Sequence, residues 1–416
     1  MKKQRIIILG GGFAGLHLAK KLNNRSFDVI LIDKLNHHQF QPLFYQVATA
    51  RLEPANISFP FRKIFQRSKN IQIRLAEVTG IVANLNTVKT TAGDYTYDHL
   101  VIATGCKTNF FGNEEIRKHA YSMKTTQEAI TIRNEILLSF EQFIYASEEE
   151  KEALLNIVIV GAGPTGVELS GAFSEMKKYI LPKDYPNIDF SGLSITLLEG
   201  SKNTLNSMSA DSQKASREYL EKMGVKIRTE TFVINYDGTL VTLNSGETIK
   251  SKNVIWAAGV SGNIIEGLTP ESIIKNRFVV DRFNKVKNYN NIYAIGDIAY
   301  MVTPKYPHGH PQLANVAINQ GKNIASNFLA ILDQKPLKEY EYKDLGSMAT
   351  IGTYKAVIDL PALKFKGVLA WFVWMFLHLM LILSVRNKFV TFMNWTWNFL
   401  AKDSSLRLIF KNDKPY

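Results

Sequence analysis

Two glycine-rich segments have the residue types and spacing that can hold the diphosphate of a dinucleotide. In the first, an apolar run over 6–9 leads into Gly10, Gly12 and Gly15, and a second apolar run ends at Asp33. The first glycine permits a tight turn, the second lets the backbone reach the phosphates, and the third lets a helix pack closely. The phosphates then lie at the helix N-terminus, where free N–H groups and the helix dipole favour negative charge. The segment therefore predicts a dinucleotide site, with Asp33 placed to accept hydrogen bonds from ribose hydroxyls.

The second segment repeats this pattern at Gly161, Gly163 and Gly166, and its acid is Glu199. An acid at this place repels a 2′-phosphate, which favours NADH over NADPH, although Lys202 lies near enough to weaken that preference. The separation between the glycines and the acid is longer than usual. We therefore expect residues 177–193, which contain two prolines, to form an inserted loop.

The elements that must position these residues are a buried strand before each set of glycines and a helix after it. Largely apolar runs over 5–9 and 156–160 predict the strands, and amphipathic runs over 16–22 and 169–176 predict the helices. The fold class expected is α/β, with two Rossmann-like dinucleotide-binding domains. The alternative is a tandem pair of structural α/β domains that bind no ligand.

Three further apolar runs, over 100–105, 254–260 and 291–297, each end in small residues where a backbone can approach a cofactor. In this order, the segments from residue 5 to about 330 resemble the two-dinucleotide flavoprotein reductases. The resemblance implies FAD at the first site and NAD(P)H at the second, with Asp297 at the FAD ribitol.

Within that superfamily the chain resembles the type II NADH:quinone dehydrogenases, through residues 38–49, residues 346–356 and a tryptophan-rich C-terminal region. The resemblance implies that the first of these segments lines the flavin and that Lys355 lies close to the isoalloxazine. Glu168 matches an acid near the nicotinamide–flavin contact. Glu168 and Lys355 are our catalytic candidates, for tuning the charge of the flavin or moving protons. Alternatively, Glu168 caps the N-terminus of its helix.

The cofactor-contact residues predicted in this way are Gly10, Gly12, Phe13, Ala14, Gly15, Asp33, Lys34, Gln46, Ala103, Thr104, Gly105, Gly161, Gly163, Pro164, Thr165, Gly166, Glu199, Ala258, Gly259, Gly296, Asp297 and Ala317.

The expected quinone segment departs from the family pattern. Asn315 and Asn319 stand where the family has glutamine in both places. Asparagine keeps the amide donor and acceptor but is one methylene shorter, which changes its reach to a carbonyl oxygen. Gln320 can compensate only if the helix turns by about 100°. We predict quinone contacts from Asn315, Asn319 and Gln320, with weakened quinone use as the alternative.

The C-terminal region suits a membrane surface. Residues 368–385 are apolar except for His378 and Ser384, so a spanning helix is one candidate. Beyond them a polar helical stripe (Asn387, Thr391, Asn394, Asn398 and Lys402) lies opposite Phe389, Phe392, Trp395 and Phe399. After residue 362 there are eight Lys or Arg against two Asp, an excess that favours anionic headgroups. We predict monotopic attachment to the bilayer surface, together with homodimer contact that the resemblance implies.

Composition narrows the function. The net charge is +13, but no basic motif interleaved with aromatics predicts a nucleic-acid partner. The single cysteine, Cys106, excludes internal disulfides and the cysteine pair that disulfide or sulfide oxidoreductases need. His308 and His310 lack an evident third ligand, so no metal is expected. The N-terminal apolar run is too short for a signal peptide, and we expect the protein inside the cell.

The expected domains are an FAD-binding domain over 1–115 and 276–345, an NADH-binding domain over 116–275, and a membrane and dimer region over 346–416. The predicted function is a respiratory NADH:quinone oxidoreductase on the cytoplasmic face of the inner membrane. It passes a hydride from NADH to FAD and two electrons to quinone, without proton pumping. The alternatives are an NADH-dependent reductase of another carrier and a non-catalytic NADH-sensing flavoprotein.

Overall fold

The computed structural model describes residues 3–404 and 406–410, and the chain divides into two compact units. The first unit comprises Met1–Gln39, Phe59–Lys107 and Val260–Lys343. The second unit comprises Phe40–Ser58, Thr108–Gly259 and Asp344–Tyr416. Each glycine fingerprint therefore lies in its own unit.

The first unit is built on a five-stranded parallel sheet in the order β22-β9-β1-β2-β5. Its strands are β1 (Arg5–Leu9), β2 (Asp28–Asp33), β5 (Ile71–Leu75), β9 (His99–Ile102) and β22 (Ile292–Ala294). Strand β1 is central and its residues 6–9 are fully buried, as expected for a strand covered on both faces. The first predicted strand is thereby confirmed.

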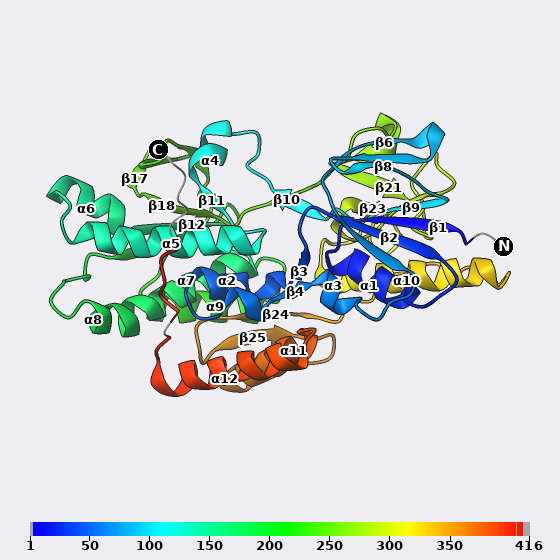
Figure 1. Cartoon of the computed structure of the whole chain (residues 1–416). Helices are drawn as coiled ribbons and strands as arrows, with labels where there is room; N and C mark the ends of the chain where they lie inside the picture. The colour runs from blue at the N-terminus through cyan, green and yellow to red at the C-terminus, as the bar shows by residue number, and fades with distance from the viewer. Residues whose placement is uncertain (1–2, 405, 411–416) are drawn as a thin grey trace. The chain divides into compact units, whose positions relative to one another are not determined.

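Helices α1 (Phe13–Leu22) and α10 (Ala314–Leu332) pack closely against each other in the first unit (Figure 1). Gly321 makes this approach possible, because a Cβ there would lie 2.4 Å from the Ala14 carbonyl oxygen. The helix that carries Asn315 and Asn319 is thus fixed directly on the helix that follows the first fingerprint.

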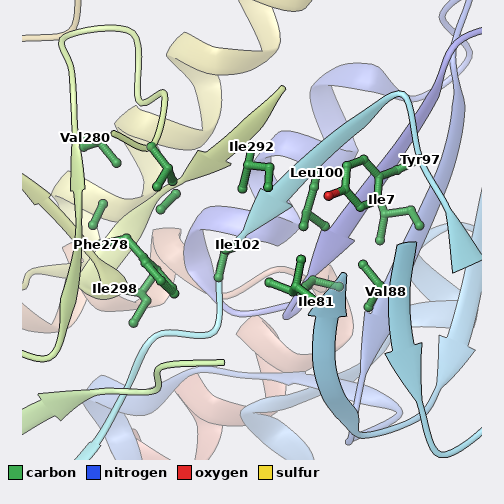
Figure 2. Close-up of a cluster of buried hydrophobic side chains, with 14 of the residues drawn as sticks. Ile7, Ile81, Val88, Tyr97, Leu100, Ile102, Phe278, Val280, Ile292 and Ile298 are labelled. Atoms are coloured by element: carbon green, nitrogen blue, oxygen red, sulfur yellow. The ribbon is translucent and has the colours of Figure 1, made fainter. Parts of the chain in front are cut away.

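Two three-stranded sheets also belong to the first unit. One contains β6 (Val78–Val82), β7 (Thr87–Thr90) and β8 (Gly93–Thr96). The other contains β20 (Ile273–Ile274), β21 (Arg277–Val280) and β23 (Ala299–Met301). Figure 2 shows the apolar core that joins them to the main sheet, with Ile7, Ile81, Leu100 and Phe278 among its buried members.

The second unit has the same kind of parallel sheet, in the order β11-β18-β12-β13-β14. Its strands are β11 (Tyr121–Ser122), β12 (Asn156–Val160), β13 (Ser194–Leu198), β14 (Lys226–Arg228) and β18 (Asn253–Trp256). Three helices of this unit pack on the sheet: α5 (Thr126–Phe143), α7 (Pro164–Glu175) and α9 (Ala210–Lys222). The unit also contains an antiparallel sheet of β15 (Val233–Tyr236), β16 (Leu240–Leu243) and β17 (Thr248–Lys250). The α/β class with two Rossmann-like units is confirmed.

The prediction of a loop over 177–193 was wrong for its first part. A π-helical turn, Met176–Ile180, continues α7, and α8 (Leu181–Asp184) follows it. The proline in α8 lies in its first turn, where a missing N–H costs little, and Met176 and Leu181 are buried. The Lys177 ammonium group donates to the carbonyl oxygens of Ser191 and Leu193, which ties the helical start of the insertion to its end.

The C-terminal part of the second unit is an antiparallel sheet and two helices. The sheet contains β24 (Ser347–Thr350), β25 (Ala356–Asp359) and β26 (Lys364–Gly367). Helix α11 (Val368–Leu381) packs on β25, and α12 (Val385–Ala401) packs on α11 (Figure 1).

The apolar run over 368–385 is not one spanning helix. Helix α11 ends at Leu381, because Ile382 is extended and Ser384 begins the next helix as its N-cap, accepting from the Asn387 N–H. Its 14 residues are about 21 Å long, whereas a bilayer core is about 30 Å thick. Among residues 3–404 and 406–410 we find no helix with the length and apolar character needed to cross a bilayer. This finding overturns the spanning candidate.

Candidate functional site

The first fingerprint has the geometry of a diphosphate cradle. Gly10 has a φ of +100°, and a Cβ there would lie 2.5 Å from the Ala103 carbonyl oxygen. Gly15 packs so closely that its Cβ would lie 1.9 Å from the Gly10 carbonyl oxygen. By contrast, a Cβ on Gly12 would meet nothing within 4 Å. The protein itself has no need of glycine at 12, so the open space over this residue fits a ligand at the N-terminus of α1.

The second fingerprint reproduces this geometry. Gly161 has a φ of +102°, and its Cβ would lie 2.9 Å from the Ala258 Cα. A Cβ on Gly166 would lie 1.9 Å from the Gly161 carbonyl oxygen, and one on Gly163 would meet nothing within 4 Å. Pro164 begins α7 and Thr165 follows it, so these predicted contacts flank the open glycine. The second unit therefore offers a second diphosphate cradle.

Both predicted ribose acids also hold their glycine turns in shape. Asp33 accepts hydrogen bonds from the Gly11 N–H at 2.6 Å and the Leu35 N–H at 2.7 Å. Glu199 accepts in the same way from the Ala162 N–H at 2.6 Å and the Ser201 N–H at 2.8 Å. Burial raises the pKa of Asp33, and the two backbone N–H groups oppose that rise. Each carboxylate has further lone pairs for ribose hydroxyls.

Other predicted cofactor contacts of the first unit surround this turn. Phe13 and Ala14 lie in the first turn of α1, and Lys34 is exposed beside Asp33. The Thr104 hydroxyl donates to the Asn263 carbonyl oxygen at 2.8 Å, and the Asn263 amide donates back to the Thr104 carbonyl at 3.0 Å. This exchange fixes the small-residue turn over 103–105.

His38 belongs to the segment expected to line the flavin. Its Nδ1 lies 3.0 Å from the Gly11 carbonyl oxygen, and its ring contacts that of Phe13 edge-on. Burial lowers the pKa of His38 to about 4, so the imidazole is neutral at physiological pH. A neutral ring can fix the glycine turn without adding charge to a phosphate site.

The turn at Asp297 is held by a residue that we expected to bind quinone. Gly296 has a φ of +77° and packs near the Cβ atoms of Ala14 and Ala317. Its N–H donates to Gln320 Oε1 at 2.7 Å, and Gln320 is buried. The Cys106 thiol donates to the Asp297 carboxylate at 3.1 Å. A quinone contact from the Gln320 oxygen would compete with its bond to Gly296.

Asn315 and Asn319 lie together on α10. The Asn319 amide nitrogen donates to Asn315 Oδ1 at 2.7 Å. The shorter side chains therefore satisfy each other one helical turn apart, and their role toward quinone stays a prediction.

Glu168 begins a buried hydrogen-bonded chain in the second unit. Its carboxylate accepts from the Thr350 N–H at 3.4 Å, and the Thr350 hydroxyl lies 3.0 Å from the Tyr45 hydroxyl. Gln46 donates to Tyr45 at 3.0 Å and accepts from the Trp395 indole N–H at 2.7 Å. The carboxylate of Glu168 thus faces β24 and not the first N–H groups of its own helix, which contradicts the capping alternative.

The environment of Glu168 favours its protonated form. Burial raises the pKa of Glu168 to about 8, and its hydrogen bonds with Thr350 oppose that rise only in part. A carboxyl group that is protonated near neutral pH can donate a proton or hold one without adding charge. This property fits the catalytic role that the sequence predicted, and the role itself stays a prediction.

Lys355 lies in the turn between β24 and β25, on the same hairpin as Thr350. Its ammonium group lies 4.7 Å from the centre of the Tyr219 ring in α9, and its carbonyl oxygen accepts from the Ile351 N–H. The Lys355 ammonium group and the Glu168 carboxyl group thus have different partners, Tyr219 and Thr350. The two catalytic candidates are therefore independent groups in the second unit.

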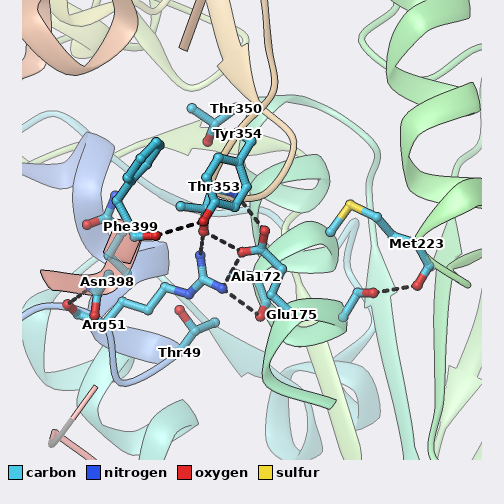
Figure 3. Close-up of polar contacts among 12 residues, drawn as sticks. Thr49, Arg51, Ala172, Glu175, Met223, Thr350, Thr353, Tyr354, Asn398 and Phe399 are labelled. Atoms are coloured by element: carbon cyan, nitrogen blue, oxygen red, sulfur yellow. Dashed lines mark hydrogen bonds and ion pairs between the residues drawn. The ribbon is translucent and has the colours of Figure 1, made fainter. Parts of the chain in front are cut away.

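Arg51 and Glu175 form a buried ion pair that the sequence did not indicate (Figure 3). The pair joins three elements near the hydrogen-bonded side chains of Glu168, Thr350 and Tyr45. Arg51 lies 2.5 Å from the Glu175 carboxylate at the end of α7. Thr353, in the turn between β24 and β25, donates its N–H and its hydroxyl to Glu175 at 2.7 and 2.8 Å. The Asn398 amide of α12 donates to the Arg51 carbonyl oxygen at 3.2 Å. Arg51 and Glu175 are 124 positions apart, so no local pattern reveals the pair.

No group of three potential metal ligands occurs within residues 3–404 and 406–410. His310 is buried against the rings of Tyr306 and Tyr340, with Glu341 3.7 Å away. It is therefore part of the core of the first unit.

Replacing Glu168 with glutamine is expected to remove a pH dependence of stability. The carboxyl titrates at about 8 when folded, against 4.5 for the ordinary group. The folded protein holds this proton over a range where the unfolded chain has lost it, so stability falls as pH rises between the two values. The melting temperature of Glu168→Gln minus that of the original chain should therefore increase from pH 5 to pH 8. A difference that stays constant over this range would contradict the assignment.

Comparison with known proteins places this geometry among the flavoprotein reductases. Residues 4–321 match the model of the pyridine nucleotide-disulphide oxidoreductase family, and residues 345–402 match the NDH2 C-terminal domain. A type II NADH:quinone oxidoreductase of Mycobacterium tuberculosis is 33% identical, over 96% of this chain and 89% of its own length. A type II NADH:quinone oxidoreductase of Staphylococcus aureus is 27% identical, over 85% of this chain and 89% of its own.

Among solved structures, NDH2 of Plasmodium falciparum in complex with NADH matches with a TM-score of 0.90 at 22% identity. The match covers 99% of this chain and all of that one. The sulfide:quinone oxidoreductase of Aquifex aeolicus matches with a TM-score of 0.73 at 18% identity, over 96% of both chains. The fold is therefore common to enzymes with different electron donors.

Proposed function

We propose a reaction from one premise: this chain belongs to the pyridine nucleotide-disulphide oxidoreductases and, with its NDH2 C-terminal domain, to the type II NADH:quinone oxidoreductases. It is an FAD-dependent enzyme that oxidises NADH and reduces quinone. The single cysteine separates it from relatives on the same fold that work through a cysteine pair. One cysteine offers no internal disulfide as an electron carrier between NADH and quinone.

The residues of the first unit fit FAD. The open space over Gly12 suits the diphosphate, and Asp33 suits a ribose. When bound, FAD supplies the redox chemistry, taking a hydride from NADH and giving two electrons to quinone. The bond from the Gly296 N–H to Gln320 holds the turn that precedes Asp297, whose carboxylate is our proposed contact to the ribitol. The predicted FAD-binding domain over 1–115 and 276–345 remains part of this proposal.

The second unit fits NADH in the same way, through Gly163 and Glu199. Glu168, protonated near neutral pH, would hold or release a proton at its carboxyl oxygen while charge moves nearby. Its hydrogen-bonded chain through Thr350, Tyr45 and Gln46 keeps that carboxyl in one orientation. Lys355, which lies over Tyr219, is the second proposed group for tuning charge. We retain residues 116–275 as the proposed NADH-binding domain.

The observation that carries the choice of a membrane acceptor is the orientation of α12. Its polar stripe faces the protein: Asn387 donates to the Ala55 and Asn56 carbonyl oxygens, and Thr391 is fully buried. Trp395, which the sequence placed on the aromatic face, is also buried, because its indole N–H reaches Gln46. The outward face of the two helices is apolar, with these exposed side chains: Val368, Leu369, Phe372, Phe376, Met380, Leu381, Val385, Phe389, Phe392, Met393, Trp397 and Leu400.

An exposed apolar face that extends over two helices fits a lipid surface or a second copy of the chain. Basic residues flank it at Lys364, Lys366, Arg386 and Lys388, which favours anionic headgroups. Three charged residues counted with this region, Lys411, Asp413 and Lys414, lie outside the described residues. We propose monotopic attachment through residues 346–416 at the cytoplasmic face of the inner membrane, with a homodimer contact in the same region.

The reaction is tested with the detergent-purified, FAD-loaded protein. NADH should bleach the flavin absorbance without oxygen, and a soluble quinone should restore it rapidly. A flavin that stays reduced with quinone but reacts with another electron carrier would support the reductase of another carrier. A flavin that NADH cannot reduce would contradict the NADH assignment.

Attachment is tested by adding charge to the outward face of α12. The double variant Trp397→Asp/Leu400→Asp should lose most of its flotation with vesicles of phosphatidylcholine and phosphatidylglycerol. The reason is that two exposed apolar side chains are replaced by carboxylates, which are costly to bury in lipid. The matched control is Leu75→Asp/Leu85→Asp, which changes two similarly exposed leucines of the first unit. Equal flotation of the α12 variant and the original chain would refute this mode of attachment.

A further inference from the structure

An exposed aromatic ring lies directly beside the acid of the second fingerprint. Phe232 is 56% exposed, although large apolar rings are usually covered. Its ring packs on the backbone of Gly200, the residue after Glu199, where a Cβ would lie 2.5 Å from a Phe232 ring carbon. The glycine therefore lets the ring approach the turn that carries the proposed ribose acid.

Hydrogen bonds hold the backbone on both sides of Phe232. The Thr231 N–H donates to the Glu199 carbonyl oxygen at 2.9 Å, and the Glu230 N–H donates to that of Ser201 at 3.0 Å. On the other side, the Phe232 N–H donates to the Asn244 side chain, and the Asn244 N–H donates back to the Phe232 carbonyl oxygen. The backbone at Phe232 is therefore held on both sides, and its exposed ring presents an apolar face to solvent.

One cation beside the turn, Arg228, is paired with a carboxylate, whereas Lys202 is exposed. Arg228, whose carbonyl oxygen accepts from the Glu199 N–H, makes a bidentate pair with Glu247 at 2.7 and 2.6 Å. That pairing engages the guanidinium group with a carboxylate. Beside the proposed ribose acid lies the aromatic ring of Phe232, which suits the flat face of a base.

We propose that Phe232 is the platform on which the adenine of NADH stacks. The inference rests on the proposed binding of NADH at the second fingerprint. With the diphosphate over Gly163 and the ribose at Glu199, the base extends past Gly200 and covers the ring of Phe232. Phe232 is then a positioning residue for the cofactor, because it contacts the end of NADH remote from the nicotinamide.

The test compares two variants with two reductants. Phe232→Ala should raise the KM for NADH by about tenfold with kcat unchanged, in the range of one lost base–aromatic stack. The same variant should oxidise reduced nicotinamide mononucleotide, which has no adenine, as well as the original chain does. Phe232→Tyr should restore the KM for NADH. The matched control is Ile234→Ala, a residue that is 55% exposed in β15, the strand that begins directly after Phe232.

The results of this test separate the stacking proposal from the proposed function. An unchanged KM for NADH in Phe232→Ala, or an equal loss with both reductants, would overturn the stacking proposal. A loss in Ile234→Ala that matches the loss in Phe232→Ala would also overturn it, since it would indicate a wider apolar contact. Failure of the original chain to oxidise NADH would instead refute the proposed function.

Discussion

Gly12→Val is expected to give a folded protein that has lost FAD, whereas Gly163→Val keeps FAD and loses NADH. Neither glycine is required by the protein itself, because both have ordinary negative φ angles and neither Cβ would meet an atom within 4 Å. A valine at either place instead fills the space assigned to a diphosphate. We expect less than about a tenth of the normal flavin content in Gly12→Val, and a KM for NADH raised by about 100-fold in Gly163→Val, a loss of about 2.7 kcal/mol.

The measurements are the flavin absorbance per protein and the kinetics of NADH oxidation. Circular dichroism of both variants should match that of the original chain, which separates ligand loss from misfolding. The two variants serve as controls for each other, since each changes an equivalent glycine in the other unit. Full flavin content in Gly12→Val, or an unchanged KM in Gly163→Val, would contradict the assigned cradles.

Arg51→Met is expected to destabilise the second unit by about 3 kcal/mol, the cost of leaving a buried carboxylate without its cation. The side chains of Arg51 and Glu175 are 20% and 10% exposed, and the pair joins α7, the β24–β25 turn and α12. Thr353 still donates to Glu175 in the variant, which places the loss at the lower end of the range for buried pairs. The measurement is urea unfolding followed by tryptophan fluorescence, because all five tryptophans belong to this unit.

Two further variants test whether the loss of stability comes from the unpaired charge of Glu175. Adding Glu175→Gln to Arg51→Met should recover much of the loss, since it removes the unpaired charge. Arg117→Met is the matched control, because Arg117 pairs with Glu114 at an exposed site where such pairs contribute little. A midpoint of Arg51→Met equal to that of Arg117→Met would show that the buried pair does not hold these elements together.

The parts of the fold that the sequence predicted depend on local spacing. Gly10 and Gly161 each sit between an apolar run and an amphipathic run, and both sets of elements have the predicted bounds within a few residues. The insertion after α7 was misjudged because its proline suggested a loop, although proline is tolerated in the first turn of α8. The apolar run over 368–385 concealed the break at Ile382–Ser384, since hydropathy does not report backbone conformation.

The site was predictable where function depends on one segment, and hidden where it depends on distant ones. Glu168 was singled out from its fingerprint, but its raised pKa comes from burial under β24, 182 positions away at Thr350. Trp395 was grouped with Phe389, Phe392 and Phe399 opposite the polar stripe. Only its partner, Gln46, decides that it turns inward. The role of Gln320 at Gly296 was hidden for the same reason.

The bonds from Asp33 and Glu199 to their own glycine turns have a thermodynamic consequence. A loop that orders only when its ligand arrives spends part of the binding energy on its lost conformational freedom. Here the carboxylates at 33 and 199 hold the N–H groups of Gly11 and Ala162 through bonds within the protein. Because these bonds form when the protein folds, both loops are ordered by folding, and each site is preorganised for its dinucleotide.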